Sequence, residues 1–237
     1  MELSAAFFLT CFCLFSVGDV NSIQPEFRHV DNRIPIVHST SSNSDNPCPN
    51  ATAIAPCVCL QDEIEYDSYN IDCSNAQNND DLERAFKADF PQKNYFRINI
   101  AQVDPSNITE IGDILNGVTF TKIYLQAETI EKISPKFLLD CANTLDTIGI
   151  FRSKMNSTGF PFEVLPQLTS LIDLYVFNSP ALTEIPLIGS ESLKSVSFEH
   201  NPNLTTISPG MLFRMFLMFL NWICFDMIRF RLSIQKL

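Results

Sequence analysis

The chain has 237 residues, of which 46% are hydrophobic, and this is enough apolar surface to exclude a wholly disordered protein. It carries 16 basic and 27 acidic residues, for a net charge of −11, so it lacks the basic surface that nucleic-acid phosphates require. With three His and seven Gly, neither a histidine-rich metal site nor a glycine-rich phosphate loop is expected. We therefore expect no nucleic-acid partner, no metal and no cofactor.

The chain opens with an apolar segment. Residues 5–17 form a short apolar run, and the small residues Ser16 and Gly18 have the spacing that a signal peptidase accepts. The run is too short to cross a bilayer. Residues 1–18 are predicted to be a signal peptide cleaved after Gly18, with a buried N-terminal helix or strand as the alternative. The polar residues 19–46 are predicted to be a flexible leader without a packed core.

The cysteines and sequons fit a secreted protein. Cleavage leaves six cysteines, which in an oxidising compartment are disulfide-bonded by default: Cys48, Cys57, Cys59, Cys73, Cys141 and Cys224. The first four form a cluster that allows three connectivities. Zinc bound by their thiolates is the alternative. Four N-x-[ST] motifs predict glycosylation, at Asn50, Asn107, Asn156 and Asn203.

A repeated apolar pattern organises residues 96–210. Pairs of apolar residues separated by one residue recur at steps of 25, 25, 26 and 22 residues, within the leucine-rich-repeat period of about 20–29 residues. The five pairs are Ile98/Ile100, Ile123/Leu125, Ile148/Ile150, Leu174/Val176 and Val196/Phe198. Because alternate side chains of a strand point to opposite sides, each pair is predicted to point into a common core. The pattern predicts an α/β repeat fold, a short leucine-rich-repeat solenoid; a generic α/β protein with accidental spacing is the alternative.

Further positions recur with the same period. Four of the pairs are followed by a second apolar couple: Ile108/Ile111, Ile130/Ile133, Leu182/Ile185 and Leu204/Ile207. The repeat consensus places an Asn after each strand, where it bonds free backbone groups of the turn. Only Asn201 holds this place cleanly, while Glu128, Ser153 and Ser179 lie at or near the other copies. We therefore expect the asparagine ladder to be mostly absent and the turns to be less regular.

Residues 47–95 are predicted to form a cysteine-rich N-terminal cap, because the first repeat of a solenoid exposes the edge of its core. Within this region Asp80 is predicted to be the N-cap of a helix, with Glu83 three residues later as in a capping box. The acidic run 78–81 offers Ca²⁺ ligands as the alternative.

The residues beside the inward pairs are predicted to face solvent as one continuous strand surface. Four aromatic residues would form a stripe on it, and exposed aromatics are typical of binding hot spots: Tyr124, Phe151, Tyr175 and Phe177. Two alternatives stand beside this interpretation. The aromatics could belong to an ordinary solvated surface, or the register could be one residue off, which would place some of them in the core.

Several phrases resemble one family. Ala55-Pro-Cys-Val-Cys59, Phe86-Lys-Ala-Asp-Phe-Pro91, Asn116-Gly-Val-Thr-Phe120 and Phe160-Pro-Phe-Glu-Val-Leu-Pro-Gln167 are similar to secreted arthropod leucine-rich-repeat proteins. This family includes the non-catalytic subunit of the Oplophorus-type luciferin 2-monooxygenase. The resemblance covers about residues 47–210 and implies an accessory or interaction role rather than luminescence. It also implies the disulfide pairs Cys48–Cys59 and Cys57–Cys73.

A secreted enzyme is the second alternative. The three histidines are His29, His38 and His200, and the first two lie in the predicted leader, which offers no preorganised site. His200 follows Glu199, and such a neighbour pair can orient a general base, but no nucleophile motif accompanies it. We therefore predict a non-catalytic protein.

Residues 211–237 differ from the rest of the chain. They carry four basic residues and one acid, in an otherwise acidic protein, and the repeat pattern stops there. The 20 apolar-rich residues 211–230 are long enough for a membrane span, but Arg214, Asn221, Asp226 and Arg229 interrupt them. A membrane-anchored receptor-like protein is thus the first alternative, and a tail produced by truncation, splicing or read-through is another.

The sequence therefore predicts a secreted, N-glycosylated leucine-rich-repeat protein that binds an extracellular protein or ligand, as an accessory subunit if the resemblance holds. A membrane contact is expected only if residues 211–237 insert.

Overall fold

The computed structural model describes residues 47–102, 107–186 and 188–209. The chain divides into two units, Met1–Asn43 and Ser44–Leu237, and all described residues belong to the second. The predicted signal peptide (1–18), leader (19–46) and tail (211–237) lie outside the described residues.

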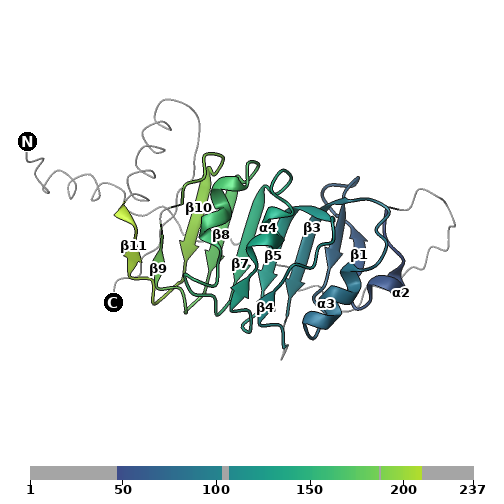
Figure 1. The fold of residues 1–237 in the computed structure, drawn as a ribbon, viewed down its shortest axis with the longest axis horizontal. Coiled ribbons are helices and arrows are strands. Elements are labelled where there is room, and N and C mark those ends of the chain that lie inside the picture. The colour runs from purple at the N-terminus through teal and green to yellow at the C-terminus, as the bar shows by residue number, and fades with distance from the viewer. Residues whose placement is uncertain (1–46, 103–106, 187, 210–237) are drawn as a thin grey trace, which may run out of the picture. The chain divides into compact units, whose positions relative to one another are not determined.

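An open, mostly parallel sheet of seven strands extends through the described residues (Figure 1). Only the first pair of strands is antiparallel, and all other neighbours are parallel. In spatial order the strands are β1 (Val58–Gln61), β2 (Tyr69–Asp72), β3 (Asn94–Ala101), β5 (Thr119–Gln126), β7 (Thr147–Phe151), β8 (Asp173–Phe177) and β10 (Ser195–Glu199).

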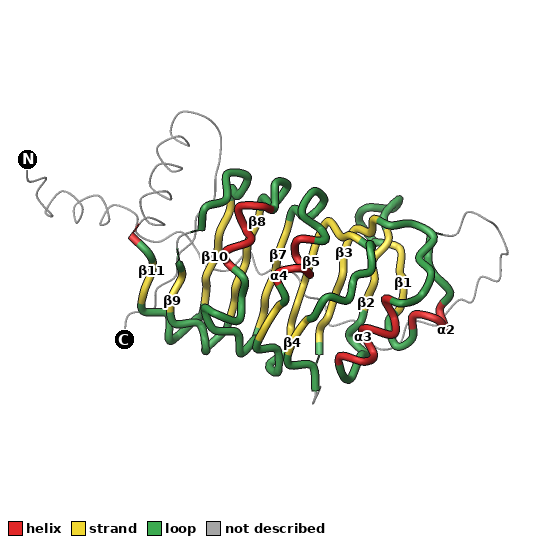
Figure 2. Tube along the Cα trace, viewed as in Figure 1, coloured by secondary structure: helices red, strands yellow, loops and turns green. Residues whose placement is uncertain are grey.

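Short helices and two narrow sheets connect these strands. The helices are α2 (Ala51–Ile54), α3 (Asn79–Phe86), α4 (Pro135–Leu139) and the 3₁₀ helix η1 (Phe162–Gln167). The narrow sheets are parallel pairs, β4 (Glu110–Ile111) with β6 (Lys132–Ile133) and β9 (Glu184–Ile185) with β11 (Thr206–Ile207). Helices α3 and α4 lie on the same face of the seven-stranded sheet (Figure 2). Parallel strands need such crossovers, and the result is an α/β arrangement.

The predicted apolar pairs occupy equivalent positions in five parallel strands. The first members are register partners from strand to strand, and so are the second members. All ten side chains are at most 5% exposed, so their predicted inward direction is confirmed. They form a core with the helices on that side. The ring centroids of Phe86 in α3 and Phe120 lie 6.1 Å apart, and Phe137 of α4 is fully buried.

The disulfide-bonded N-terminal region contributes one more strand to the parallel ladder, which the sequence pattern did not reveal. Strand β2 pairs in parallel with β3, with Ile71 opposite Ile98, and both side chains are fully buried. Two residues on, the Cys73 N–H donates to the Asn99 carbonyl at 2.8 Å. Ile71 and Cys73 therefore act as an inward pair, with a half-cystine in the place of an aliphatic residue.

The second apolar couples build the narrow sheets. Ile111 pairs with Ile133, and Ile185 pairs with Ile207. The segment that follows β7 looks degenerate in sequence, yet it continues this arrangement, since the Ile133 N–H donates to the Gly159 carbonyl at 2.9 Å. A Cβ at Gly159 would lie 2.0 Å from the Glu131 carbonyl oxygen, so this close approach of backbones requires glycine.

Three turns after the strands share one conformation. Arg152, Asn178 and His200 directly follow β7, β8 and β10, and they have positive φ values of 52°, 52° and 56°. Buried Ser153, Ser179 and Asn201 directly follow these three residues. The residues that follow β3 and β5, Gln102 and Ala127, do not have a positive φ, so the turns differ across the five copies as expected, although these three are alike.

A buried side-chain ladder supports these turns. The Ser153 and Ser179 hydroxyl oxygens lie 2.9 Å apart. The Ser179 N–H donates to Asn201 Oδ1 at 2.8 Å, and Asn201 Nδ2 donates to the Val176 carbonyl at 3.0 Å. All three ladder side chains are at least 91% buried, whereas Glu128 is exposed. The ladder thus spans three successive turns and does not include Glu128.

The N-terminal region contains two disulfides, Cys48–Cys59 and Cys57–Cys73, which is the pairing that the resemblance implies. Cys141 is a buried free thiol, whose sulfur accepts the Phe120 N–H at 3.3 Å. Burial raises the pKa of this thiol to about 12, so it stays protonated at neutral pH. Cys224 lies outside the described residues.

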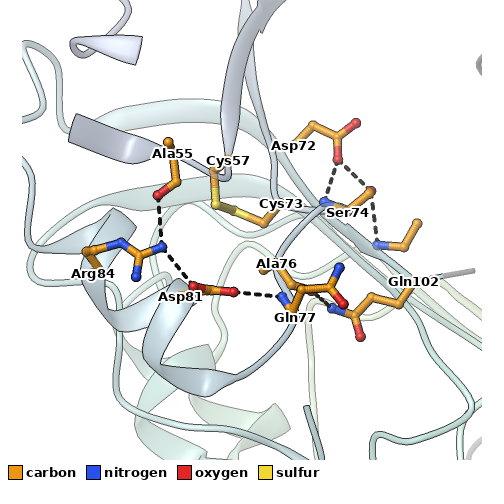
Figure 3. The surroundings of a disulfide bond; sticks show 11 residues. Ala55, Cys57, Asp72, Cys73, Ser74, Ala76, Gln77, Asp81, Arg84 and Gln102 are labelled. Carbon is orange, nitrogen blue, oxygen red and sulfur yellow. Dashed lines mark hydrogen bonds and ion pairs between the residues drawn. A yellow bond between two sulfur atoms is a disulfide. The ribbon is translucent and has the colours of Figure 1, made fainter. Parts of the chain in front are cut away.

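Helix α3 begins earlier than predicted. Its N-cap is Asn78, whose Oδ1 accepts the Asp81 N–H at 2.9 Å, so the prediction of Asp80 is wrong. The reason is that Asp81, rather than Glu83, reaches back and accepts the Gln77 N–H at 2.9 Å. Figure 3 shows Asp81 between Gln77 and Arg84, beside the Cys57–Cys73 bond. Arg84 also donates to the Ala55 carbonyl at 3.3 Å, and this joins α3 to the disulfide-bonded segment.

Replacing Asn201 tests the buried ladder. Asn201→Ala leaves the Ser179 N–H and the Val176 carbonyl without these partners, so we expect a loss of about 1–3 kcal/mol in unfolding free energy. Urea denaturation measures it. The matched control is Asn143→Ala, because Asn143 is exposed and its side-chain Oδ1 accepts a long 3.4 Å bond from the Thr169 hydroxyl. Equal losses for the two variants would contradict a structural role for the ladder.

Candidate functional site

The candidate site is the outward face, which we define as the face of the seven-stranded sheet opposite the inward pairs. Its positions in the five repeats are those predicted: Arg97, Asn99, Ala101, Lys122, Tyr124, Gln126, Thr147, Gly149, Phe151, Asp173, Tyr175, Phe177, Ser195, Ser197 and Glu199. Most are half-buried while their neighbours in sequence are buried, so the register is the predicted one and not one residue off. Thr147 and Gly149 are the exceptions, because both are buried.

Aromatic rings contact one another across adjacent strands of the outward face. Tyr124 lies 6.3 Å from Phe151, and Phe151 lies 6.5 Å from Phe177, between ring centroids. The row ends at His200, whose ring is 4.6 Å from that of Phe177. These four rings, which we call the aromatic row, include three of the four residues predicted as a stripe. The fourth, Tyr175, has Gly149 and Ser197 as its register partners.

Gly149 explains how two of these rings fit. A Cβ at this position would lie 2.5 Å from Tyr124 Cδ1 and 2.6 Å from Phe151 Cε2. Both distances are far below van der Waals contact, so the rings rest against the backbone of β7 only because residue 149 has no side chain. The sequence pattern places Gly149 on the outward face but gives no sign of this function.

The β3 end of the outward face combines cations with aromatic rings. The Arg97 guanidinium carbon lies 5.6 Å from the Tyr124 ring centroid and 5.7 Å from that of Phe96. The Lys122 ammonium lies 4.8 Å from the Phe96 centroid. Each such contact contributes about 0.5–1 kcal/mol at exposed sites. The aromatic row therefore begins beside two positive charges.

Arg97 also forms an ion pair with Asp62, a residue that the sequence did not single out. Asp62 Oδ2 lies 2.6 Å from an Arg97 guanidinium nitrogen and accepts Asn70 Nδ2 at 2.8 Å. Its Oδ1 accepts the N–H groups of Ile64 and Glu65 at 3.0 and 2.9 Å. Burial opposes ionisation, but the Asn70 bond, the two backbone bonds and the Arg97 charge together hold the pKa of Asp62 below 3.8. Asp62 thus links the β1–β2 hairpin to the outward face.

The histidine considered for catalysis has other partners. His200 is exposed and its ring contacts Phe177. The Glu199 carboxylate accepts the Ser197 hydroxyl at 2.9 Å. His29 and His38 lie outside the described residues.

The sequence leaves two metal sites as alternatives, zinc at the four clustered cysteines and Ca²⁺ at residues 78–81, and the geometry of the described residues supports neither. Within the described ranges, no group of three or more His, Cys, Asp and Glu is placed to hold a metal ion. All four clustered cysteines are in disulfides, so the thiolates that zinc would need are used. A cavity of about 10 Å³ lies on the other side of the sheet between Ile150, Phe160 and Leu182, and it has room for at most one water molecule.

All four sequon asparagines are exposed. In two of them the Thr hydroxyl of the motif donates to the asparagine Oδ1, at 2.7 Å for Asn50 and 2.8 Å for Asn156. None of the four lies in a strand of the seven-stranded sheet. Glycans at these positions would therefore be attached outside the strands that carry the aromatic row.

No helix in the described part of the chain is long and apolar enough to cross a membrane.

Comparison with known proteins gives no relative. No protein-family model, no curated protein and no solved structure matches the chain. The candidate site is therefore defined by its own geometry.

Substitution of Gly149 tests the contact with the rings. Gly149→Ala forces Tyr124 and Phe151 off the sheet, and we expect a loss of about 1–3 kcal/mol in unfolding free energy, as for other overpacked sites. In a Tyr124→Ala background the same change should cost less, because one of the two rings is gone. Gly112→Ala is the matched control, since nothing lies within 4 Å of its Cβ position. An equal cost of Gly149→Ala in both backgrounds would show that the ring is not the obstacle.

The lowered pKa of Asp62 predicts a pH-dependent stability. A carboxyl whose folded pKa is depressed adds stability above its unfolded pKa, and this is lost as pH falls through the folded pKa. Asp62→Asn should therefore destabilise the protein at pH 7, with a difference from wild type that narrows below about pH 4. Urea titrations over this range measure it, with the exposed Asp67→Asn as control. A difference independent of pH would mean that the charge of Asp62 does not matter.

Proposed function

We propose that the chain is a leucine-rich-repeat solenoid of about five repeats with a disulfide-bonded N-terminal cap. Three observations support this. The strands recur at 22–26 residues with inward pairs in register, the second couples form narrow sheets, and a buried Ser/Asn ladder follows the strands. A stack of short repeats buries apolar faces that a single repeat leaves open.

We further propose that the protein is secreted and N-glycosylated. Its two disulfides require an oxidising environment. The exposure of Asn50, Asn107, Asn156 and Asn203 supports glycan attachment at the four sequons.

The function that this geometry supports best is non-catalytic binding of an extracellular protein through the outward face. One observation carries it: half-buried rings from three adjacent parallel strands contact one another on the face that the inward pairs leave toward solvent. Rings fixed in this way lose little entropy on binding, and rigid aromatics are enriched among hot spots. The resemblance to the non-catalytic luciferase subunit supports an accessory role in a secreted complex.

Two ring truncations test the proposal. The wild-type protein and the Phe151→Ala/Phe177→Ala variant are immobilised and exposed to the extracellular fluid of the producing tissue, and bound proteins are quantified by mass spectrometry. We expect the variant to recover at least one protein in an amount about tenfold or more below that recovered by wild type. Ile172→Ser is the control, because Ile172 is exposed and lies outside the aromatic row.

Urea denaturation of each variant separates loss of binding from loss of fold. If the folded double variant recovers the same proteins in the same amounts as wild type, the aromatic row is not the binding surface.

A further inference from the structure

Exposed apolar side chains are concentrated in one hairpin. Among the described residues, five large hydrophobic side chains are exposed, and four of them belong to β1 and the loop that joins it to β2: Val58, Leu60, Ile64 and Tyr66. Ile64 is 79% exposed and Tyr66 is 73% exposed. Scattered apolar residues need no explanation, but a cluster on one element marks an interaction surface.

Acidic residues alternate with the exposed apolar residues of this hairpin. The segment 58–67 contains Asp62, Glu63, Glu65 and Asp67 and no basic residue. Asp62 is buried against Arg97, whereas Glu63, Glu65 and Asp67 are exposed, and within the described ranges no ion pair involves these three. The two most exposed apolar side chains, Ile64 and Tyr66, are therefore flanked by carboxylates on both sides.

The loop is held in one conformation by its own polar groups. Asp62 accepts the N–H groups of Ile64 and Glu65 and pairs with Arg97. The Asp62 N–H donates to the Ser68 carbonyl at 2.8 Å, and the Ser68 N–H donates to the Glu65 carbonyl at 2.7 Å. Gln61 Nε2 donates to the Tyr66 carbonyl. A loop backbone fixed in this way lowers the ordering cost when Ile64 and Tyr66 contact a partner.

The hairpin lies at the end of the sheet. Strand β1 is the first strand in spatial order, and Val58 and Leu60 pair with Asp72 and Asn70 of β2 (Figure 1). Strand β2 pairs with β3 in the same register as the other parallel strands, so the β2 partners of Val58 and Leu60 lie on the outward face. Val58 and Leu60 therefore lie on that face too, beyond the strands that carry the aromatic row. The hairpin surface and the aromatic row are thus made of different residues at different places.

We propose that the β1–β2 hairpin is a docking surface for a basic segment of a partner protein, in which cationic and apolar side chains alternate. The charges select this occupant. The same hairpin of a second copy would place carboxylates against carboxylates, whereas lysine or arginine side chains would pair with Glu63, Glu65 and Asp67 while apolar neighbours cover Ile64 and Tyr66. This surface adds to the proposed function and does not depend on the aromatic row.

The probe is a fluorescein-labelled peptide of four Lys-Val repeats, titrated with the full chain and followed by fluorescence anisotropy. We expect saturable binding that weakens as salt is raised. Ile64→Ser/Tyr66→Ser should weaken it by about tenfold or more, and Glu63→Gln/Glu65→Gln should weaken it and flatten its salt dependence. Phe151→Ala/Phe177→Ala should leave it unchanged. This last variant separates failure of the hairpin proposal from failure of the proposed function.

Four outcomes would overturn the proposal. The first is that the Ile64→Ser/Tyr66→Ser variant binds the Lys-Val peptide as tightly as wild type does, and the second is that a Lys-Ser peptide binds wild type as tightly as the Lys-Val peptide does. The third is self-association of the chain that Ile64→Ser abolishes. The fourth is peptide binding that appears only when residues 19–46 are removed. The last two would identify a second copy or the preceding segment of the chain as the occupant.

Discussion

Ten apolar side chains, two from each of five parallel strands, point to the same side of the sheet and are aligned in register. The rest of the structure depends on this alignment, because side chains along a strand alternate with a period of two. With one member of each pair fixed in the core, the residues between them have to face outward. A slip of one residue would expose the inward pairs and bury polar neighbours such as Asn99, Asp173 and Ser197, at a large cost in free energy.

The same alignment determines which side chains lie next to one another on the outward face. Register places Tyr124, Gly149 and Tyr175 side by side, and the missing side chain at Gly149 lets the Tyr124 ring lie against the sheet. The rings are therefore held by the backbone of the next strand as well as by one another. At one end the Arg97–Asp62 pair connects this face to the β1–β2 hairpin.

The parts of the fold that repeat were predictable, since five copies of one pattern specify both the strands and their inward sides. Features that depend on a single contact were not. Asp62 and Arg97 form an ion pair although they are 35 residues apart in the sequence. A side chain is excluded at Gly149 only because of the rings of its neighbours. Ser153 and Ser179 do not match the asparagine consensus, yet their hydroxyls reach each other once the turns are stacked. The N-cap of α3 was misplaced because Asn78 and Asp80 are equally good caps in isolation.

Register is the central claim, and hydroxyl-radical footprinting read by mass spectrometry tests it most directly. Phe177 and Phe198 lie on neighbouring strands and on opposite faces of the sheet, with Phe198 only 4% exposed and Phe177 half-buried. Normalised to the urea-unfolded chain, Phe151 and Phe177 should be oxidised much faster than Phe198 and Phe120. Protection of Phe151 and Phe177 together with rapid oxidation of Phe198 would contradict the alignment on which the fold and the candidate site are built.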